Sequence, residues 1–264
     1  MLDLHCHLLP AIDDGATDVP MALEMARQAW DDGIRTVACT PHIYPGMYDN
    51  NRAGIQAAID AFVPRLRDAG IELELVIGAD VHLDRSLVEG IQTGRIPTLA
   101  DSRYLLLEPP HHVAPPRFEE TVFELMVAGI VPVITHPERL RWIDDHYDVF
   151  KRLVGQGAWM QITAGALTGR FGKRPKYWGE RMLDEGLVHV LATDAHNPVR
   201  RPPRLAEGRD AAARRIGDAH AIHLVHTRPQ GIIDNVEPDA MPPLPSGAAP
   251  QDTRPFWRRL LGAA

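Results

Sequence analysis

The chain has 264 residues, of which 45% are hydrophobic and 24% are charged, and its formal net charge is −7. This length suits one large domain or two small ones with a sizeable core, and the net negative charge argues against nucleic acid as the main partner. No run approaches the roughly 18 apolar residues that span a bilayer, and the N-terminus lacks the pattern of a signal peptide. The only cysteines are Cys6 and Cys39, which fits a reducing compartment, so we expect a cytoplasmic protein without a transmembrane segment.

Apolar strand-like runs alternate with segments of helical periodicity along most of the chain. The expected strands are 2–5, 36–40, 73–77, 104–107, 131–135, 159–163 and 188–193. The expected helices are 19–32, 53–69, 83–92, 117–128, 145–155, 176–185 and 204–216. For the first helix, Asp18 is a typical N-cap, Pro20 suits the first turn, and Gly33 marks the end. Strands alternating with helices predict a parallel sheet, closed into a distorted TIM-like barrel or left open as a doubly wound sheet.

The composition changes near Pro238. Residues 241–250 are rich in Pro, Gly and Ala without periodicity, and residues 255–261 are basic and aromatic. We therefore divide the chain into a main domain at 1–237 and a linker with a basic-aromatic tail at 238–264. The tail has two interpretations, a frayed terminus or a docking peptide for a partner or an anionic membrane surface.

Side chains that can ligate metal ions stand at or just after the ends of six of the seven expected strands. Because active sites of barrels and open α/β sheets gather at the carboxyl ends of the strands, we expect these side chains to converge. His5 and His7, two residues apart on a strand, point to the same side. The full set of candidate ligands is His5, His7, Asp14, His42, Asp80, Glu108, His136, Asp194 and His196.

The chemistry of this set predicts a cluster of ions. Five imidazoles and four carboxylates suit zinc, manganese or iron and are too many for one ion, but they suffice for two or three ions that share a bridging carboxylate. Clustered divalent ions promote displacement at phosphorus and suit a dianionic phosphate. Neither cysteine has the Cys-x5-Arg pattern of cysteine phosphatases, and no GxSxG serine elbow accompanies Gly165, so covalent hydrolysis is disfavoured.

Several nearby polar residues have weaker interpretations. Asp13 either caps a turn or acts directly in catalysis. His111 and His112 are expected on a solvated loop, with lining of the pocket as the alternative. His82 could replace Asp80 as a ligand, and the sixth strand offers no obvious ligand.

Six short motifs occur in a fixed order along the chain. They are Asp3-Leu4-His5-Cys6-His7, Asp13-Asp14-Gly15, Thr40-Pro41-His42, the segment 96–104, His136-Pro137-Glu138-Arg139, and Asp194-Ala195-His196-Asn197 followed by Arg201-Pro202-Pro203. In these motifs the chain resembles the polymerase and histidinol phosphatase (PHP) superfamily. Within it, the chain is most similar to bacterial capsule and exopolysaccharide tyrosine phosphatases of the CpsB/YwqE type. The resemblance extends from His5 to about Asn235.

The resemblance implies a distorted (β/α)7 barrel of the PHP type with three divalent ions. Manganese is the expected ion, with iron, zinc or cobalt as alternatives. The implied ligands are His5, His7, Asp80 and Asp194 for the first ion, Asp80, Glu108 and His136 for the second, and Asp14, His42 and His196 for the third. Arg139 and Arg201 would bind the phosphate. Asp80 stands where the family usually has glutamate, so the expected bridge is one methylene shorter.

From these residues and the resemblance we expect a metal-dependent phosphotyrosine-protein phosphatase. The implied partner is the phosphotyrosine tail of a bacterial tyrosine kinase of capsule or exopolysaccharide synthesis, with a second copy of this chain, in a homo-oligomer, as a further candidate. One alternative is a small-molecule phosphatase of the histidinol-phosphate kind. The other is a weakly catalytic scaffold that binds its partner through residues 256–261.

Overall fold

The computed structural model describes residues 1–245. Its strands are β1 (Leu2–Cys6), β2 (Thr36–Cys39), β3 (His42–Tyr44), β4 (Tyr48–Asp49), β5 (Glu74–Ile77), β6 (Asp80–His82), β7 (Tyr104–Glu108), β8 (Val131–Thr135), β9 (Trp159–Thr163) and β10 (Val190–Ala192). Its α-helices are α1 (Val19–Asp31), α2 (Arg52–Asp68), α3 (Leu87–Gln92), α4 (Phe118–Val127), α5 (Ile143–Gln156), α6 (Ala164–Leu167), α7 (Lys173–Asp184), α8 (Ala206–Ile216), α9 (Asp218–Ile222) and α10 (Arg228–Ile233). Short helical turns are η1 (Leu99–Asp101), η2 (Pro137–Arg139), the π-helical η3 (His223–Thr227) and η4 (Pro238–Ala240).

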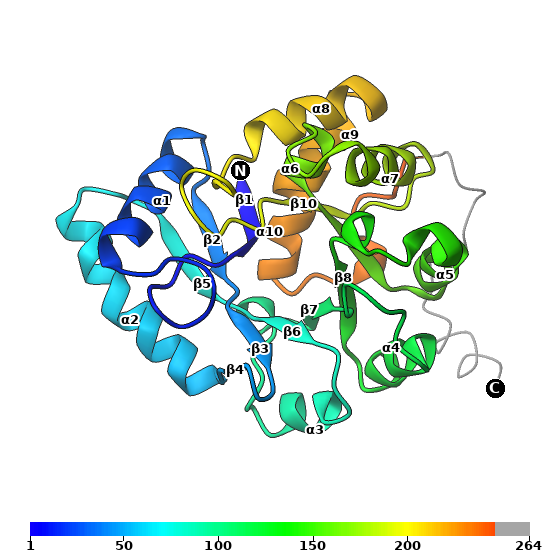
Figure 1. Cartoon of the computed structure of the whole chain (residues 1–264), viewed down its shortest axis with the longest axis horizontal. Helices are drawn as coiled ribbons and strands as arrows, with labels where there is room; N and C mark the ends of the chain where they lie inside the picture. The colour runs from blue at the N-terminus through cyan, green and yellow to red at the C-terminus, as the bar shows by residue number, and fades with distance from the viewer. Residues whose placement is uncertain (246–264) are drawn as a thin grey trace.

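The strands form two hydrogen-bonded sheets that together make a distorted barrel. One sheet has the order β1-β2-β5 and the other β10-β9-β8-β7-β6-β3-β4, and every pair except β3–β4 is parallel. Only two residues separate β2 from β3 and β5 from β6, so these strand paths pass from one sheet into the other. The ring closes where the Asp194 N–H donates to the His5 carbonyl (2.8 Å) and the His7 N–H to the Ala195 carbonyl (2.9 Å). Helices surround the ring (Figure 1).

The seven predicted strands are confirmed as β1, β2, β5, β7, β8, β9 and β10, whereas β3, β4 and β6 lie outside the predicted ranges and were missed. A Thr-Pro pair separates β2 from β3, and a Gly-Ala pair separates β5 from β6. The predicted helices are confirmed as α1, α2, α3, α4, α5, α7 and α8. Asp18 is the N-cap of α1, since its Oδ1 accepts a hydrogen bond from the Met21 N–H at 2.9 Å. The sequence analysis missed α6, α9, η3 and α10, which are short and lack a clear helical period.

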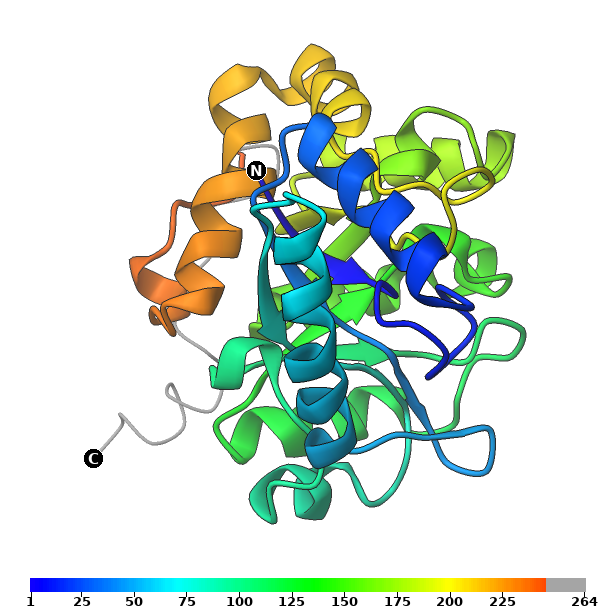
Figure 2. The same ribbon diagram turned by 90° about the vertical axis from the view of Figure 1, so that its left-hand side faces the viewer.

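Apolar residues pack on both faces of the barrel wall. Side chains such as Leu4, Leu106 and Val133 form an inner cluster that includes Ile232 of α10, while Leu105, Leu107 and Ile134 belong to the larger cluster under the outer helices. Figure 2 shows the helices of residues 218–233 at one end of the strands and the β3–β4 hairpin at the opposite end. The carboxyl ends of the parallel strands therefore remain available for polar side chains.

The segment after α10 returns to the domain. Arg228, which is 1% exposed, donates hydrogen bonds to the carbonyls of Pro242 (3.2 Å) and Pro243 (2.8 Å). The expected basic-aromatic tail at 255–261 lies outside the described residues. None of the helices within residues 1–245 is long and apolar enough to cross a membrane.

Candidate metal centre

All nine predicted ligands converge at the carboxyl ends of the strands. His5 belongs to β1 and His7 follows it, and Glu108 ends β7. His42 and Asp80 lie just after the carboxyl ends of β2 and β5, as the first residues of β3 and β6. The remaining ligands lie in the loops that follow β1, β8 and β10. They are Asp14, His136, Asp194 and His196. All except Asp14 and His42 are buried, so most of the ligands are sheltered from water.

The first group of ligands surrounds His5. Its Nε2 lies 3.4 Å from Asp80 Oδ2, 3.4 Å from Asp194 Oδ1 and 3.3 Å from His7 Nε2. His7 Nε2 lies 3.4 Å from the same Asp194 oxygen. These four side chains are the set that the resemblance implies for the first ion.

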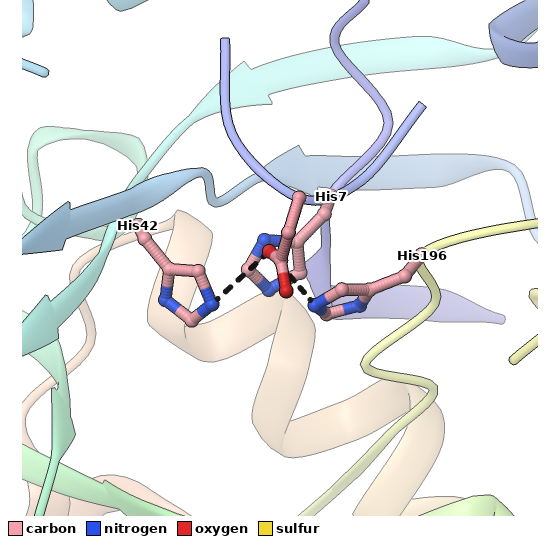
Figure 3. Close-up of side chains that lie close together, drawn as sticks. His7, His42 and His196 are labelled. Atoms are coloured by element: carbon pink, nitrogen blue, oxygen red, sulfur yellow. Dashed lines mark ion pairs between the residues drawn. The ribbon is translucent and has the colours of Figure 1, made fainter. Parts of the chain in front are cut away.

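A second group surrounds Asp14. The Oδ1 atom of Asp14 lies 3.4 Å from His42 Nε2 and 3.3 Å from His196 Nε2. Figure 3 shows His42 and His196 approaching from opposite sides, with His7 between them. Asp14, His42 and His196 are the set that the resemblance implies for the third ion.

Asp80 and Glu108 connect the remaining ligands. His42 Nδ1 lies 3.3 Å from Asp80 Oδ2 and 3.4 Å from Glu108 Oε2, and Glu108 Oε1 lies 3.7 Å from His136 Nε2. Asp80 therefore touches both His5 and His42, although its side chain is short. The His82 ring stacks on Tyr44 with centroids 3.9 Å apart, and its Nδ1 lies 3.8 Å from Glu108 Oε2.

These spacings fit divalent ions. Two ligand atoms at about 2.0–2.2 Å from one tetrahedral ion lie about 3.4 Å apart, and the distances above cluster around that value. Both Asp80 oxygens and His136 Nδ1 are buried without a hydrogen-bond partner among the described residues. A buried carboxylate whose only neighbours of opposite charge within residues 1–245 are the His5 and His42 imidazoles is costly, so this set of ligand atoms is one that cations complete.

The protonation of these groups also suits ion binding. Burial alone would raise the pKa of Asp80, but His5 and His42 hold that pKa well below its usual range. Burial and then Arg139 hold the pKa of His136 well below its usual range, so this imidazole is neutral. Despite burial, Asp80 and Asp194 raise the pKa of His5 to about 9. An ion that binds His5 must therefore displace a proton.

Two polar side chains orient the ligands. Gln161 Oε1 on β9 lies 2.9 Å from His5 Nδ1, and both side chains are fully buried. Asp13 Oδ2 lies 2.7 Å from His7 Nδ1, and Asp13 Oδ1 accepts the Gly15 N–H at 2.9 Å. Such contacts set the tautomer and direction of a ligating imidazole. Asp13 thus caps a turn, as one interpretation predicted, and also holds His7.

Sequence reasoning missed Gln161 because an amide is a poor metal ligand and the sixth strand otherwise looks like an ordinary buried strand. The signal that could have identified it is a polar side chain inside the apolar run 159–163. Glu138 is a second buried polar side chain to which the sequence analysis gave no role. Its Oε1 accepts the Thr163 N–H at 2.9 Å, and burial raises its pKa to about 7.

Two arginines border the ligands. Arg139 and Arg201 both pair with Asp194 Oδ2, the latter at 2.6 Å, whereas Asp194 Oδ1 faces His5 and His7. Burial would raise the pKa of Asp194, but Arg201, His5 and Arg139 hold that pKa well below its usual range. One carboxylate thus joins the ligand group to two guanidinium groups.

His111 lies in the loop after β7 with its side chain 30% exposed, and its contacts favour the alternative interpretation, that it lines the site. Its Nε2 lies 3.2 Å from Glu108 Oε1, and its ring centroid lies 4.8 Å from that of His136. His112, the next residue, is exposed as expected.

The fold and the site define an α/β-barrel protein whose strand ends can hold several divalent ions, as in metal-dependent hydrolases. The chain belongs to the CpsB/CapC family of capsular polysaccharide synthesis, which matches residues 1–234. It is 39% identical over 197 residues to tyrosine-protein phosphatase YwqE of Bacillus subtilis, covering 75% of this chain and 78% of that protein. It is 27% identical over 243 residues to tyrosine-protein phosphatase CpsB of Streptococcus pneumoniae, covering 88% of this chain and 98% of that protein.

A solved structure has the same fold. It comes from work on YwqE of Bacillus subtilis and CpsB of Streptococcus pneumoniae, described as unique metal-dependent tyrosine phosphatases. The match has a TM-score of 0.87 and 35% identity and covers 93% of this chain and 99% of the other. The family that the sequence motifs resemble is thereby confirmed.

Proposed function

We propose that this protein is a metal-dependent phosphotyrosine-protein phosphatase. The observation that carries the proposal is the arrangement around Asp194, whose Oδ1 faces His5 and His7 and whose Oδ2 pairs with Arg139 and Arg201. A phosphate bound beside the ligand groups would lie within reach of both guanidinium groups. The relatives named tyrosine-protein phosphatases support this assignment.

We assign the ligands to three ions, with manganese as the expected metal. When bound, such ions supply a nucleophilic hydroxide at neutral pH and neutralise charge on the phosphate. The sets are His5, His7, Asp80 and Asp194; Asp80, Glu108 and His136; and Asp14, His42 and His196. Asp80 is shared between the first two sets, in keeping with its contact to His5 of the first set and with ligand atoms of Asp80 and Glu108 that lie within 4.8 Å of each other.

Arg139 and Arg201 bind and orient the phosphate in this proposal. Planar guanidinium forks match phosphate oxygens bidentately and stabilise charge on the equatorial oxygens during transfer. The Arg139 guanidinium also lies over the Phe171 ring, with its carbon 4.6 Å from the ring centroid, which restricts its movement.

A phosphotyrosine substrate is chemically consistent with this site. Phenolate is a fairly good leaving group because the pKa of a tyrosine hydroxyl is about 10, so a strong general acid is not required. We infer that the substrate is the phosphotyrosine tail of a bacterial kinase that controls capsule or exopolysaccharide synthesis, in keeping with the family. We place the reaction in the cytoplasm, which the free thiols of Cys6 and Cys39 support.

The test uses the full chain, purified and loaded with manganese. We expect release of phosphate from p-nitrophenyl phosphate and phosphotyrosine peptides, and higher kcat/KM on the peptides than on histidinol phosphate. Chelation by EDTA or the substitution His136→Ala should abolish the reaction. His226→Ala, which changes an exposed histidine, is the matched control and should leave the rate unchanged. Activity that survives both EDTA and His136→Ala would refute the metal-dependent mechanism.

A further inference from the structure

His111 is a histidine beside the ligand groups that the assignment above leaves without a role, as is His82, whose Nδ1 lies 3.8 Å from Glu108 Oε2. His111 lies in the loop after β7, and its side chain is 30% exposed. Ligand atoms of Glu108, His111 and His136 all lie within 4.8 Å of one another. His111 therefore stands at the outer side of the second ligand set.

The distances match those of ligands on a shared ion. His111 Nε2 lies 3.2 Å from Glu108 Oε1, and His136 Nε2 lies 3.7 Å from the same oxygen. Two ligands of one tetrahedral ion are expected about 3.4 Å apart, between these two values. The rings of His111 and His136 are tilted by 41° rather than stacked flat, so both can direct a nitrogen toward Glu108.

The backbone around His111 is held in place. The Arg141 N–H donates to the His111 carbonyl at 2.9 Å, and the Trp142 indole N–H donates to the Pro110 carbonyl at 2.8 Å. These two bonds tie the loop to the segment that follows His136. The imidazole of His111 is thus presented to Glu108 from a backbone segment that these two hydrogen bonds hold in place, which is what a metal ligand requires.

We propose that His111, through Nε2, is a fourth protein ligand of the ion assigned to Asp80, Glu108 and His136. The inference rests on the proposed metal-dependent function and deepens it. The second set then holds two carboxylates and two imidazoles. A second imidazole favours later transition metals over magnesium or calcium, which prefer oxygen ligands.

The first test measures metal content. Full-length wild type, His111→Ala and His112→Ala are dialysed against graded concentrations of a chelator, and the ions per chain are counted by elemental analysis. We expect His111→Ala to lose one ion per chain at a chelator concentration at least about tenfold lower than wild type does, because even indirect supports of a ligand contribute that much to affinity. His112→Ala, the exposed neighbour, should behave as wild type.

The second test separates a ligand from a residue that only hydrogen-bonds Glu108. Anomalous diffraction from manganese-loaded wild-type crystals should place an ion within about 2.3 Å of His111 Nε2, close to the usual metal–imidazole distance. An ion held by Asp80, Glu108 and His136 but more than about 3 Å from His111 Nε2 would overturn this inference alone. Equal ion retention in His111→Ala and wild type would do the same. A wild-type chain that binds no ions would refute the proposed function itself.

Discussion

Replacing Gln161 by leucine tests whether a residue that binds no ion controls the affinity of the metal centre. Gln161 Oε1 and His5 Nδ1 are 2.9 Å apart and fully buried, so this contact keeps the proton on Nδ1 and leaves Nε2 free to face Asp80 and Asp194. Leucine has a similar size and no acceptor. The substitution Gln161→Leu therefore removes the orientation of His5 while it keeps the volume.

The size of the effect follows from the buried contact. A buried donor left without a partner costs about 1–3 kcal/mol. Each 1.4 kcal/mol corresponds to a factor of ten, so ion affinity should fall by about 5- to 150-fold. Loss of a hydrogen bond to a metal-ligating histidine typically lowers metal affinity about 10- to 100-fold, which agrees with this range. Gln161 Nε2 has no partner among the described residues, so the substitution breaks no other hydrogen bond there.

The assay is a competition titration of manganese between the protein and a metallochromic indicator, with kcat/KM on p-nitrophenyl phosphate measured at saturating metal. Gln92→Leu, which changes an exposed glutamine at the end of α3, is the matched control and should bind ions as wild type does. If Gln161→Leu binds manganese within twofold of wild type, His5 does not depend on this contact and the reasoning is wrong.

Three further substitutions test other parts of the structure. In Gly15→Ala, the new β-carbon would overlap the His7 carbonyl oxygen, so urea unfolding should show a loss of about 1–3 kcal/mol, and unchanged stability would contradict this. Arg139→Lys removes a bidentate fork, so kcat/KM on a phosphotyrosine peptide should fall at least about tenfold while the ion count stays constant; a parallel loss of ions would instead show a structural role. Burial and then Arg228 hold the pKa of His189 well below its usual range, so below about pH 6.5 the unfolded chain binds a proton that the folded protein does not. Stability should therefore decrease as the pH falls below that value, by up to about 1.4 kcal/mol per pH unit. In unfolding experiments at about pH 5.5 and pH 7.5, the difference in stability between the two pH values should be smaller for His189→Gln than for wild type. An equal difference in the two proteins would refute the assignment.

Much of the fold could be predicted because its signals are local. Each of the seven predicted strands is a short apolar run, and α1 follows Asp18 because that side chain caps its own helix. The helices after residue 217 were missed because their stability comes from contacts with the rest of the protein. Ile232, for example, packs with Leu4 and Val133 inside the barrel, at a great distance in sequence. Tertiary packing of this kind leaves little periodicity for sequence reasoning to detect.

The site, like the fold, has one part that could be predicted from the sequence and one part that could not. The candidate ligands could be predicted from the sequence, because imidazole and carboxylate side chains that recur at successive strand ends indicate a metal site far more strongly than any one of them does alone. The contacts that orient these side chains could not be predicted from the sequence. Gln161 reaches His5 across 156 residues of sequence, and only the closure of β1 against the segment after β10 brings His5 and Asp194 together.

By itself, then, the sequence determined the functional groups that this protein offers: a parallel α/β framework, nine side chains at its strand ends that can ligate metal ions, and two arginines suited to phosphate. The tertiary structure decided how these groups are shared. It placed Asp80 between His5 and His42, divided the two oxygens of Asp194 between histidines and arginines, and brought His111 to Glu108. The physical reason is that donor chemistry belongs to each side chain, whereas distances of 3–4 Å between donors depend on how the barrel closes and how its loops are anchored.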